Sequence, residues 1–228
     1  MRPRRLLSAM SLLAAAAAFS ASVATAGSTA PFRVRADVLP VSCDVILANN
    51  GVVDFGVIPA RNLSDNAFVM AGERSINLTL TCDAPAQVSI TATDGRKGTA
   101  VAGMGAFLFP GAQNDQSTFG VGSVDGKNVG GYVLWRSTAA VADGGSTDFI
   151  ASSDNGAVWQ RGTTATNALI PDARMHGWAL TGTTMPGAYS TISQTYNIRL
   201  GLNSRNGLPP LTGDTAIDGL ATITIHYL

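Results

Sequence analysis

The chain has 228 residues, of which 46% are hydrophobic and only 13% are charged, and its formal net charge is zero. The lack of a basic excess argues against nucleic acid as a partner, because binding to phosphates needs clustered lysine and arginine. Many glycines, few charges and little helix-favouring Glu or Lys indicate an all-β protein.

The first 26 residues have the pattern of a secretory signal peptide. Three arginines precede an apolar run from Leu6 to Phe19, and Ala24-Thr25-Ala26 forms a small-residue cleavage site. The run is too short to span a membrane as a helix. Without this segment the chain has twelve basic and fifteen acidic side chains, a net charge of −3. We therefore expect export, with residues 1–26 removed, 27–42 forming an amino-terminal extension and 43–228 forming one domain.

The extension contains an alternating segment. Apolar side chains fall on one face and charged side chains (Arg33, Arg35 and Asp37) on the other, which is typical of a strand. The apolar face consists of Phe32, Val34, Ala36 and Val38. Charges on the opposite face would limit unwanted edge pairing.

Two cysteines, Cys43 and Cys82, occur in the whole chain. In an exported protein an even pair with no thiol left over predicts a disulfide. A metal or redox pair would need closer cysteine spacing or nearby histidines, and the sequence has neither. We predict a structural bond.

Further strands are predicted on both sides of Cys82. Val52–Ile58 is bounded by turn residues, and two runs alternate clearly, Ser75–Cys82 and Gln87–Thr93. The side chains expected to face the core are Ile76, Leu78, Leu80, Cys82, Val88, Ile90 and Ala92.

The middle third is rich in glycine. Met104–Phe109 and Val129–Trp135 are predicted to be strands. Tight turns are predicted at Asp94-Gly95, Asp125-Gly126, Asp143-Gly144 and Asn155-Gly156. This pattern favours hairpins added to a sandwich. Trp135, Trp159 and Trp178 could form a sugar-binding platform, but tryptophans packed in the core are the favoured interpretation.

The chain closes with two strand patterns, one from Tyr189 to Leu202 and one from Ala221 to Leu228. In the second, Ala221, Ile223, Ile225 and Tyr227 share a face. A strongly patterned terminal strand should be paired in a sheet.

Signs of catalysis are absent from the sequence. His176 could form a triad with Asp172 and a serine, but no nucleophile motif accompanies it. No phosphate-binding loop, metal-ligand cluster or suggestive pair of carboxylates occurs. The sequence predicts a protein without cofactor, metal site or enzyme activity.

In order and spacing, these features resemble a chaperone–usher pilus subunit, of the fimbrial-like group of unknown function. The resemblance is carried by the arm before Cys43, by Val-Asp-Phe-Gly-Val at 53–57, and by Ile-Asn-Leu-Thr-Leu-Thr-Cys-Asp ending at Asp83. Phe-Gly-Val-Gly at 119–122, the segment 125–132 and the penultimate tyrosine add to it. One departure is the chain's greater length, with the surplus between about residues 96 and 186.

The resemblance implies an incomplete immunoglobulin-like, pilin-type β-sandwich that lacks its final strand. A periplasmic chaperone would lend a strand first. At an outer-membrane usher, the arm of a neighbouring pilus subunit, with Ala36 at the tightest pocket, would replace it. The implied groove strand comprises Ile223, Ile225, Tyr227 and Leu228, with Leu228 presenting a carboxylate to the chaperone.

The resemblance also implies a route through the periplasm to a cell-surface fimbria, and a role in adhesion with a host or surface glycan as a conceivable ligand. Two alternatives remain open on the residues alone. One is a secreted carbohydrate-binding sandwich that uses the middle tryptophans. The other is a structural protein of the periplasm whose own arm fills its own groove.

Overall fold

The computed structural model describes residues 30–37, 40–110, 114–136, 138–211 and 213–228. The chain divides into two units, Met1–Leu39 and Pro40–Leu228. In the first unit, residues 30–37 form neither helix nor strand. The predicted signal peptide and Val38 of the extension lie outside the described residues. No helix in the described part of the chain has the length and hydrophobicity needed to cross a membrane.

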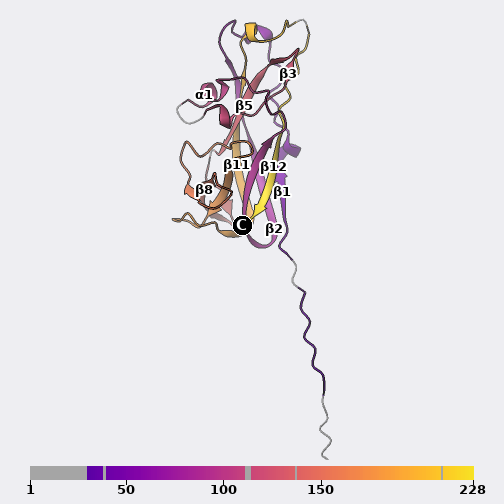
Figure 1. The fold of residues 1–228 in the computed structure, drawn as a ribbon, viewed down its shortest axis with the longest axis vertical. Coiled ribbons are helices and arrows are strands. Elements are labelled where there is room, and N and C mark those ends of the chain that lie inside the picture. The colour runs from indigo at the N-terminus through magenta and orange to yellow at the C-terminus, as the bar shows by residue number, and fades with distance from the viewer. Residues whose placement is uncertain (1–29, 38–39, 111–113, 137, 212) are drawn as a thin grey trace, which may run out of the picture. The chain divides into compact units, whose positions relative to one another are not determined.

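The second unit consists mainly of strands (Figure 1). They are β1 (Cys43–Leu47), β2 (Val69–Asp94), β3 (Ser123–Val124), β4 (Lys127–Asn128), β5 (Gly130–Arg136), β6 (Val141–Ala142), β7 (Gly145–Ser146), β8 (Asp148–Ser152), β9 (Gln160–Arg161), β10 (Met175–Ala179), β11 (Ala188–Leu202) and β12 (Ala221–Tyr227). Helices are short: α1 (Met104–Leu108) and 3₁₀ turns at Ala48–Gly51, Ala60–Asn62, Asp115–Ser117 and Arg205–Gly207. The all-β prediction is confirmed.

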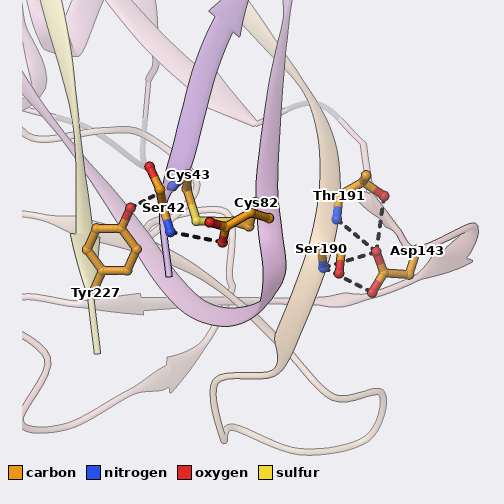
Figure 2. Close-up of a disulfide and its surroundings, with 8 residues drawn as sticks. Ser42, Cys43, Cys82, Asp143, Ser190, Thr191 and Tyr227 are labelled. Atoms are coloured by element: carbon orange, nitrogen blue, oxygen red, sulfur yellow. Dashed lines mark hydrogen bonds between the residues drawn. A yellow bond between two sulfur atoms is a disulfide. The ribbon is translucent and has the colours of Figure 1, made fainter. Parts of the chain in front are cut away.

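Strand β2 organises the sheet, because it pairs with four other strands. Its first part pairs with β1 and β11, and its last part pairs with β10 and β12, all antiparallel. Between these parts the ribbon bends just beyond Cys82 (Figure 2). The main path of the sheet runs β7-β6-β11-β2-β10-β8-β9, while β1, β5 and β12 pair off this path.

The two parts of β2 contribute to one hydrophobic core. The side chains predicted to face inward are buried in one cluster: Ile76, Leu78, Leu80, Cys82, Val88, Ile90 and Ala92. Inward residues of β5 and β11, such as Leu134 and Ile198, join the same cluster. The alternation in both runs was therefore interpreted correctly, and so were the strands near 129–135 and 189–202.

The predicted strand at Met104–Phe109 is wrong, because this segment forms α1. Met104 and Leu108, one helical turn apart, pack on Val133 and Trp135 in a second, smaller cluster. The Asp115 carboxylate accepts hydrogen bonds from the backbone N–H groups of Gly103 and Gly105 at 2.7 and 3.2 Å. This side chain fixes the start of the helix from a distant position in the chain.

Three of the four predicted tight turns have the expected left-handed backbone, at Asp125-Gly126, Asp143-Gly144 and Asn155-Gly156. The first closes the β3–β4 hairpin and the second closes β6–β7. Asp94-Gly95 does not have this left-handed backbone. Asp94 ends β2, and its carboxylate accepts from the N–H groups of Arg96 and Gly120 at 2.8 and 2.9 Å.

Candidate functional site

Strands β1 and β12 are among several strands that have a single strand partner in the described part of the chain. Both β1 and β12 pair with β2 alone. Their inward side chains are only half-buried, although they pack on the main core: Val45, Leu47, Ala221, Ile223 and Ile225. On β2, Leu78 and Leu80 are fully buried. The core is therefore incompletely covered along these two edges.

An apolar cavity of about 230 Å³ lies between the two edges. Its walls include Leu47 of β1 and Ala221 and Ile223 of β12. Its remaining lining comes mainly from β2, β5, β11 and the segment after β1, and includes Val53, Phe55, Ile76, Leu78, Tyr132, Leu134, Leu169, Tyr196, Ile198 and Leu200. We call this cavity, with the facing edges of β1 and β12, the groove.

Val52–Ile58 runs along the groove but is not a strand, so this prediction is wrong. Alternation survives as far as Phe55, since Val53 and Phe55 line the cavity while Val52 and Asp54 are exposed. It ends at Val57, which would share the inward face but is exposed. Asp54 Oδ1 accepts a hydrogen bond from the Gly56 N–H at 2.7 Å, and Gly56 has a φ of 68°. This local turn ends the extended backbone before a ladder can form.

At one end of the groove, Tyr227 joins the two edges (Figure 2). The Cys43 N–H donates to Tyr227 Oη at 2.7 Å, which joins the start of β1 to the end of β12. Here Cys43 is bonded to Cys82, and the predicted disulfide is confirmed. The Ser42 N–H donates to Asp83 Oδ1 at 3.0 Å beside it. Because β1 starts where β12 ends, the two edges run in opposite directions.

We expect Tyr227→Phe to lower the free energy of unfolding by about 1 kcal/mol, the usual net value of one hydrogen bond. The ring is retained, and with 53% of Tyr227 exposed the larger cost of emptying a buried site does not apply. Guanidinium denaturation of both proteins measures the difference. Thr224→Val, on the exposed face of β12, is the control and should change stability by less than half as much.

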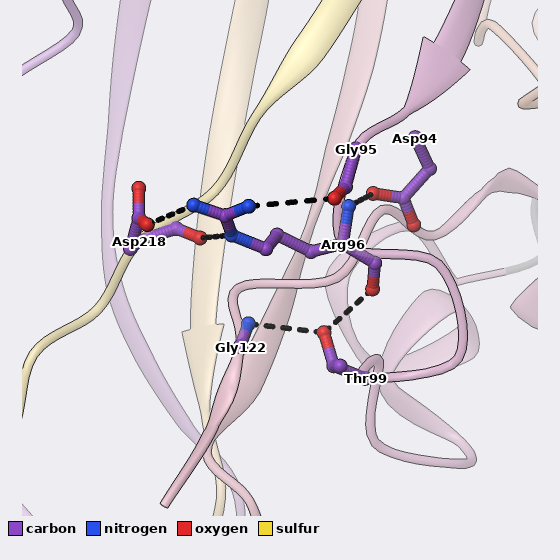
Figure 3. A network of polar contacts seen from close by, with 6 residues as sticks. All are labelled: Asp94, Gly95, Arg96, Thr99, Gly122 and Asp218. Carbon is purple, nitrogen blue, oxygen red and sulfur yellow. Dashed lines mark hydrogen bonds and ion pairs between the residues drawn. The ribbon is translucent and has the colours of Figure 1, made fainter.

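At the other end of the groove, Arg96 holds the segment of chain that immediately precedes β12 (Figure 3). Its guanidinium forms an ion pair with the Asp218 carboxylate and also donates through Nε to the Asp218 carbonyl at 3.0 Å. The Gly95 N–H donates to the Leu220 carbonyl at 2.8 Å. A Cβ at Gly219 would lie 2.7 Å from the Tyr132 ring. These contacts fix the point at which β12 begins.

Tyr132, in the lining, is held neutral. Burial raises the pKa of its hydroxyl above the ordinary value, and the neighbouring Asp94 carboxylate raises it further. The groove therefore presents an uncharged surface at this position.

The described residues of the predicted arm, 30–37, are all exposed. Phe32 and Val34 are 90% and 79% exposed, and Ala36 is also exposed. Val38 lies outside the described residues. At the end of the predicted groove strand, Leu228 is half-exposed, and its N–H donates to the Gln87 carbonyl at 3.0 Å.

The residues considered for a triad are not brought together. Asp172 pairs with Lys97 at 3.1 Å, whereas His176 is fully buried and bonds to Tyr196 Oη at 3.1 Å. The middle tryptophans form no shared exposed platform, because Trp135 and Trp178 are 7% and 1% exposed.

Sequence reasoning missed Arg136, which ends β5 and is only 3% exposed. It also missed the ion pair between Arg96 and Asp218. Neither has a local signal, since an arginine beside a turn or at the end of an apolar run is ordinarily exposed.

Comparison with known proteins gives a partial match. Residues 32–133 match a family described as a protein of unknown function, DUF1120. The chain is 35% identical over 147 residues to the uncharacterized protein YhcF of Escherichia coli K12, covering 59% of this chain and 62% of YhcF. It is 31% identical over 90 residues to the protein GltF of the same organism, covering 38% of this chain and 35% of GltF. The chain therefore matches less than two thirds of either relative. The family match takes in the arm from Phe32, both cysteines, β1 and β2.

Proposed function

We propose that this chain is an exported structural subunit of a fimbria or fimbria-like fibre, assembled by inserting a partner's strand into the groove. The observation that carries the proposal is the pair of unpaired edges, β1 and β12, facing each other across an open apolar cavity. Unpaired backbone groups beside apolar side chains favour strand addition.

The arm of a second copy fits this groove in length and pattern. The alternating segment from Phe32 to Val38 has seven residues, as does β12. At about 3.3 Å per residue, both span roughly 23 Å. One face of the arm is apolar and would face the cavity, while Arg33 and Arg35 would face solvent.

The incomplete immunoglobulin-like sandwich belongs to this proposal. Support comes from the two parts of β2, which share one core, and from the resemblance to pilus subunits. The proposed partners are a periplasmic chaperone that occupies the groove in transit, an outer-membrane usher and neighbouring subunits. The assembled fibre would contribute to adhesion at the cell surface.

We expect Ala36→Arg to reduce fibre formation by more than about 100-fold, because it places an unpaired charge in an apolar groove. Electron microscopy and size-exclusion chromatography of the exported protein measure the yield. Asp37→Arg is the matched control, since it adds the same side chain on the outward face. Equal fibre yields from Ala36→Arg and the unmodified protein would rule out the arm as the inserted strand.

A further inference from the structure

Tyr196 takes part in both the groove and a buried polar cluster. Its ring lines the groove cavity. Its hydroxyl forms hydrogen bonds with two buried side chains. Arg136 Nε lies 3.3 Å from Tyr196 Oη, and His176 Nδ1 lies 3.1 Å from the same oxygen. Arg136 Nε also donates to His176 Nδ1 at 3.2 Å. The three residues come from β5, β10 and β11.

Arg136 is an unusual member of a core, because none of its hydrogen-bond partners in the described part of the chain is a carboxylate. Its Nη1 donates to the Gly177 carbonyl at 3.1 Å, and its guanidinium lies 3.7 Å from the Phe149 ring centroid and 5.1 Å from that of Trp178. Burial lowers the pKa of Arg136. A buried cation is costly unless hydrogen bonds and charge-compensating contacts offset its loss of hydration.

His176 supplies the acceptor that Arg136 needs. Because arginine only donates, His176 Nδ1 must be unprotonated, and the neutral ring carries its proton on Nε2. Burial, Arg136 and Arg174 all lower the pKa of His176, while the backbone at Ala168 and Thr166 acts in the opposite direction. The His176 ring also stacks on Tyr196, with 12° between the planes.

We propose that Arg136 and His176 are positioning residues for the groove: they hold Tyr196 as a fixed part of its floor and thereby set the affinity for an inserted strand. This inference rests on the proposed function. A tyrosine that borders a cavity can gain contacts by rotating into it, because protein interiors favour close packing. The two bonds to its hydroxyl oppose that rotation and keep the cavity open, which lowers the cost of binding.

The test measures binding of a synthetic peptide of residues 30–40 to the full-length chain carrying Ala36→Arg, whose own arm is disabled. We expect His176→Leu and Tyr196→Phe to weaken binding by about tenfold or more, equivalent to about 1.4 kcal/mol. His176→Gln should stay within about threefold, because its amide oxygen can accept from Arg136. Affinities are measured by calorimetry and corrected for the folded fraction by circular dichroism.

Gln194→Leu is the matched control for a purely structural effect. Gln194 lies two residues before Tyr196 on β11, is 1% exposed, and donates to the carbonyls of Thr138 and Thr195, both at 2.9 Å. This variant should lose stability without losing affinity. If the peptide does not bind to the Ala36→Arg chain, the proposed function and this inference both fail. If it binds, and His176→Leu and Tyr196→Phe bind it as well as the control does, the inference fails and the proposed function stands.

Discussion

Replacing both cysteines with serine should lower the free energy of unfolding by about 4 kcal/mol, the value that the chain-entropy model gives for a 39-residue loop. This is a large share of the 5–15 kcal/mol typical of a whole domain. The disulfide also fixes Cys43, whose N–H donates a hydrogen bond to Tyr227 at the end of the groove. Guanidinium denaturation without reductant measures the loss.

The control uses the same chain with and without reductant. Reduction should destabilise the unmodified protein by about the same amount and leave the double-serine variant unchanged. Mass spectrometry before reduction should detect no free thiol. A loss below about 1 kcal/mol would show that the bond constrains the unfolded chain far less than the model assumes.

Much of the core could be predicted because alternation is a local property. The period of two over residues 75–82 and 87–93 places Ile76, Leu78 and Ile90 on buried faces, and the structure agrees. The disulfide follows from the cysteine count combined with the predicted export. The hydrophobic period and the cysteine count can both be used without knowing which distant residues become neighbours in the fold.

Of the two wrong strand predictions, one arises where residues outside the segment decide the local structure, and the other arises from a turn within the segment. The short apolar run at 104–109 fits a strand or a helix equally well. Asp115 and the Val133–Trp135 surface select the helix, and neither belongs to the run itself. Val52–Ile58 has a strand's alternation but turns at Gly56 before it forms a ladder.

The groove could be placed only partly from the sequence. The pattern identifies Ile223 and Ile225 as inward-facing, but an uncovered edge depends on which strands lack a second neighbour. The anchoring of Tyr196 depends on Arg136 and His176, which lie 60 and 20 residues away from it along the chain. No local pattern joins such residues.

Acid should destabilise the protein through His176. The pKa of His176 is lowered well below the ordinary value of 6.5, chiefly by burial. An unfolded chain therefore binds a proton that the folded chain excludes, and stability falls as pH drops below 6.5. The loss is up to about 1.4 kcal/mol per pH unit until the folded pKa is reached.

Three carboxylates with lowered pKa values act in a separate pH range. The pKa values of Asp143, Asp154 and Asp172 are lowered below their ordinary value of 3.8 by hydrogen bonds. Their contribution to stability is therefore complete above that pH and is lost only in stronger acid. A fall in stability between pH 6.5 and 4.5 can thus be assigned to a histidine.

Denaturation midpoints measured across this range should fall steadily for the unmodified protein and stay nearly level for His176→Gln, which cannot be protonated. His226→Gln removes the chain's other histidine, which bonds to Thr91 Oγ1 at 2.8 Å on the half-exposed β12, and should retain the fall. An equal fall in His176→Gln would show that a different group takes up the proton. Because His176 accepts from Arg136, protonation would place two cations in contact inside the core, and unfolding relieves their repulsion.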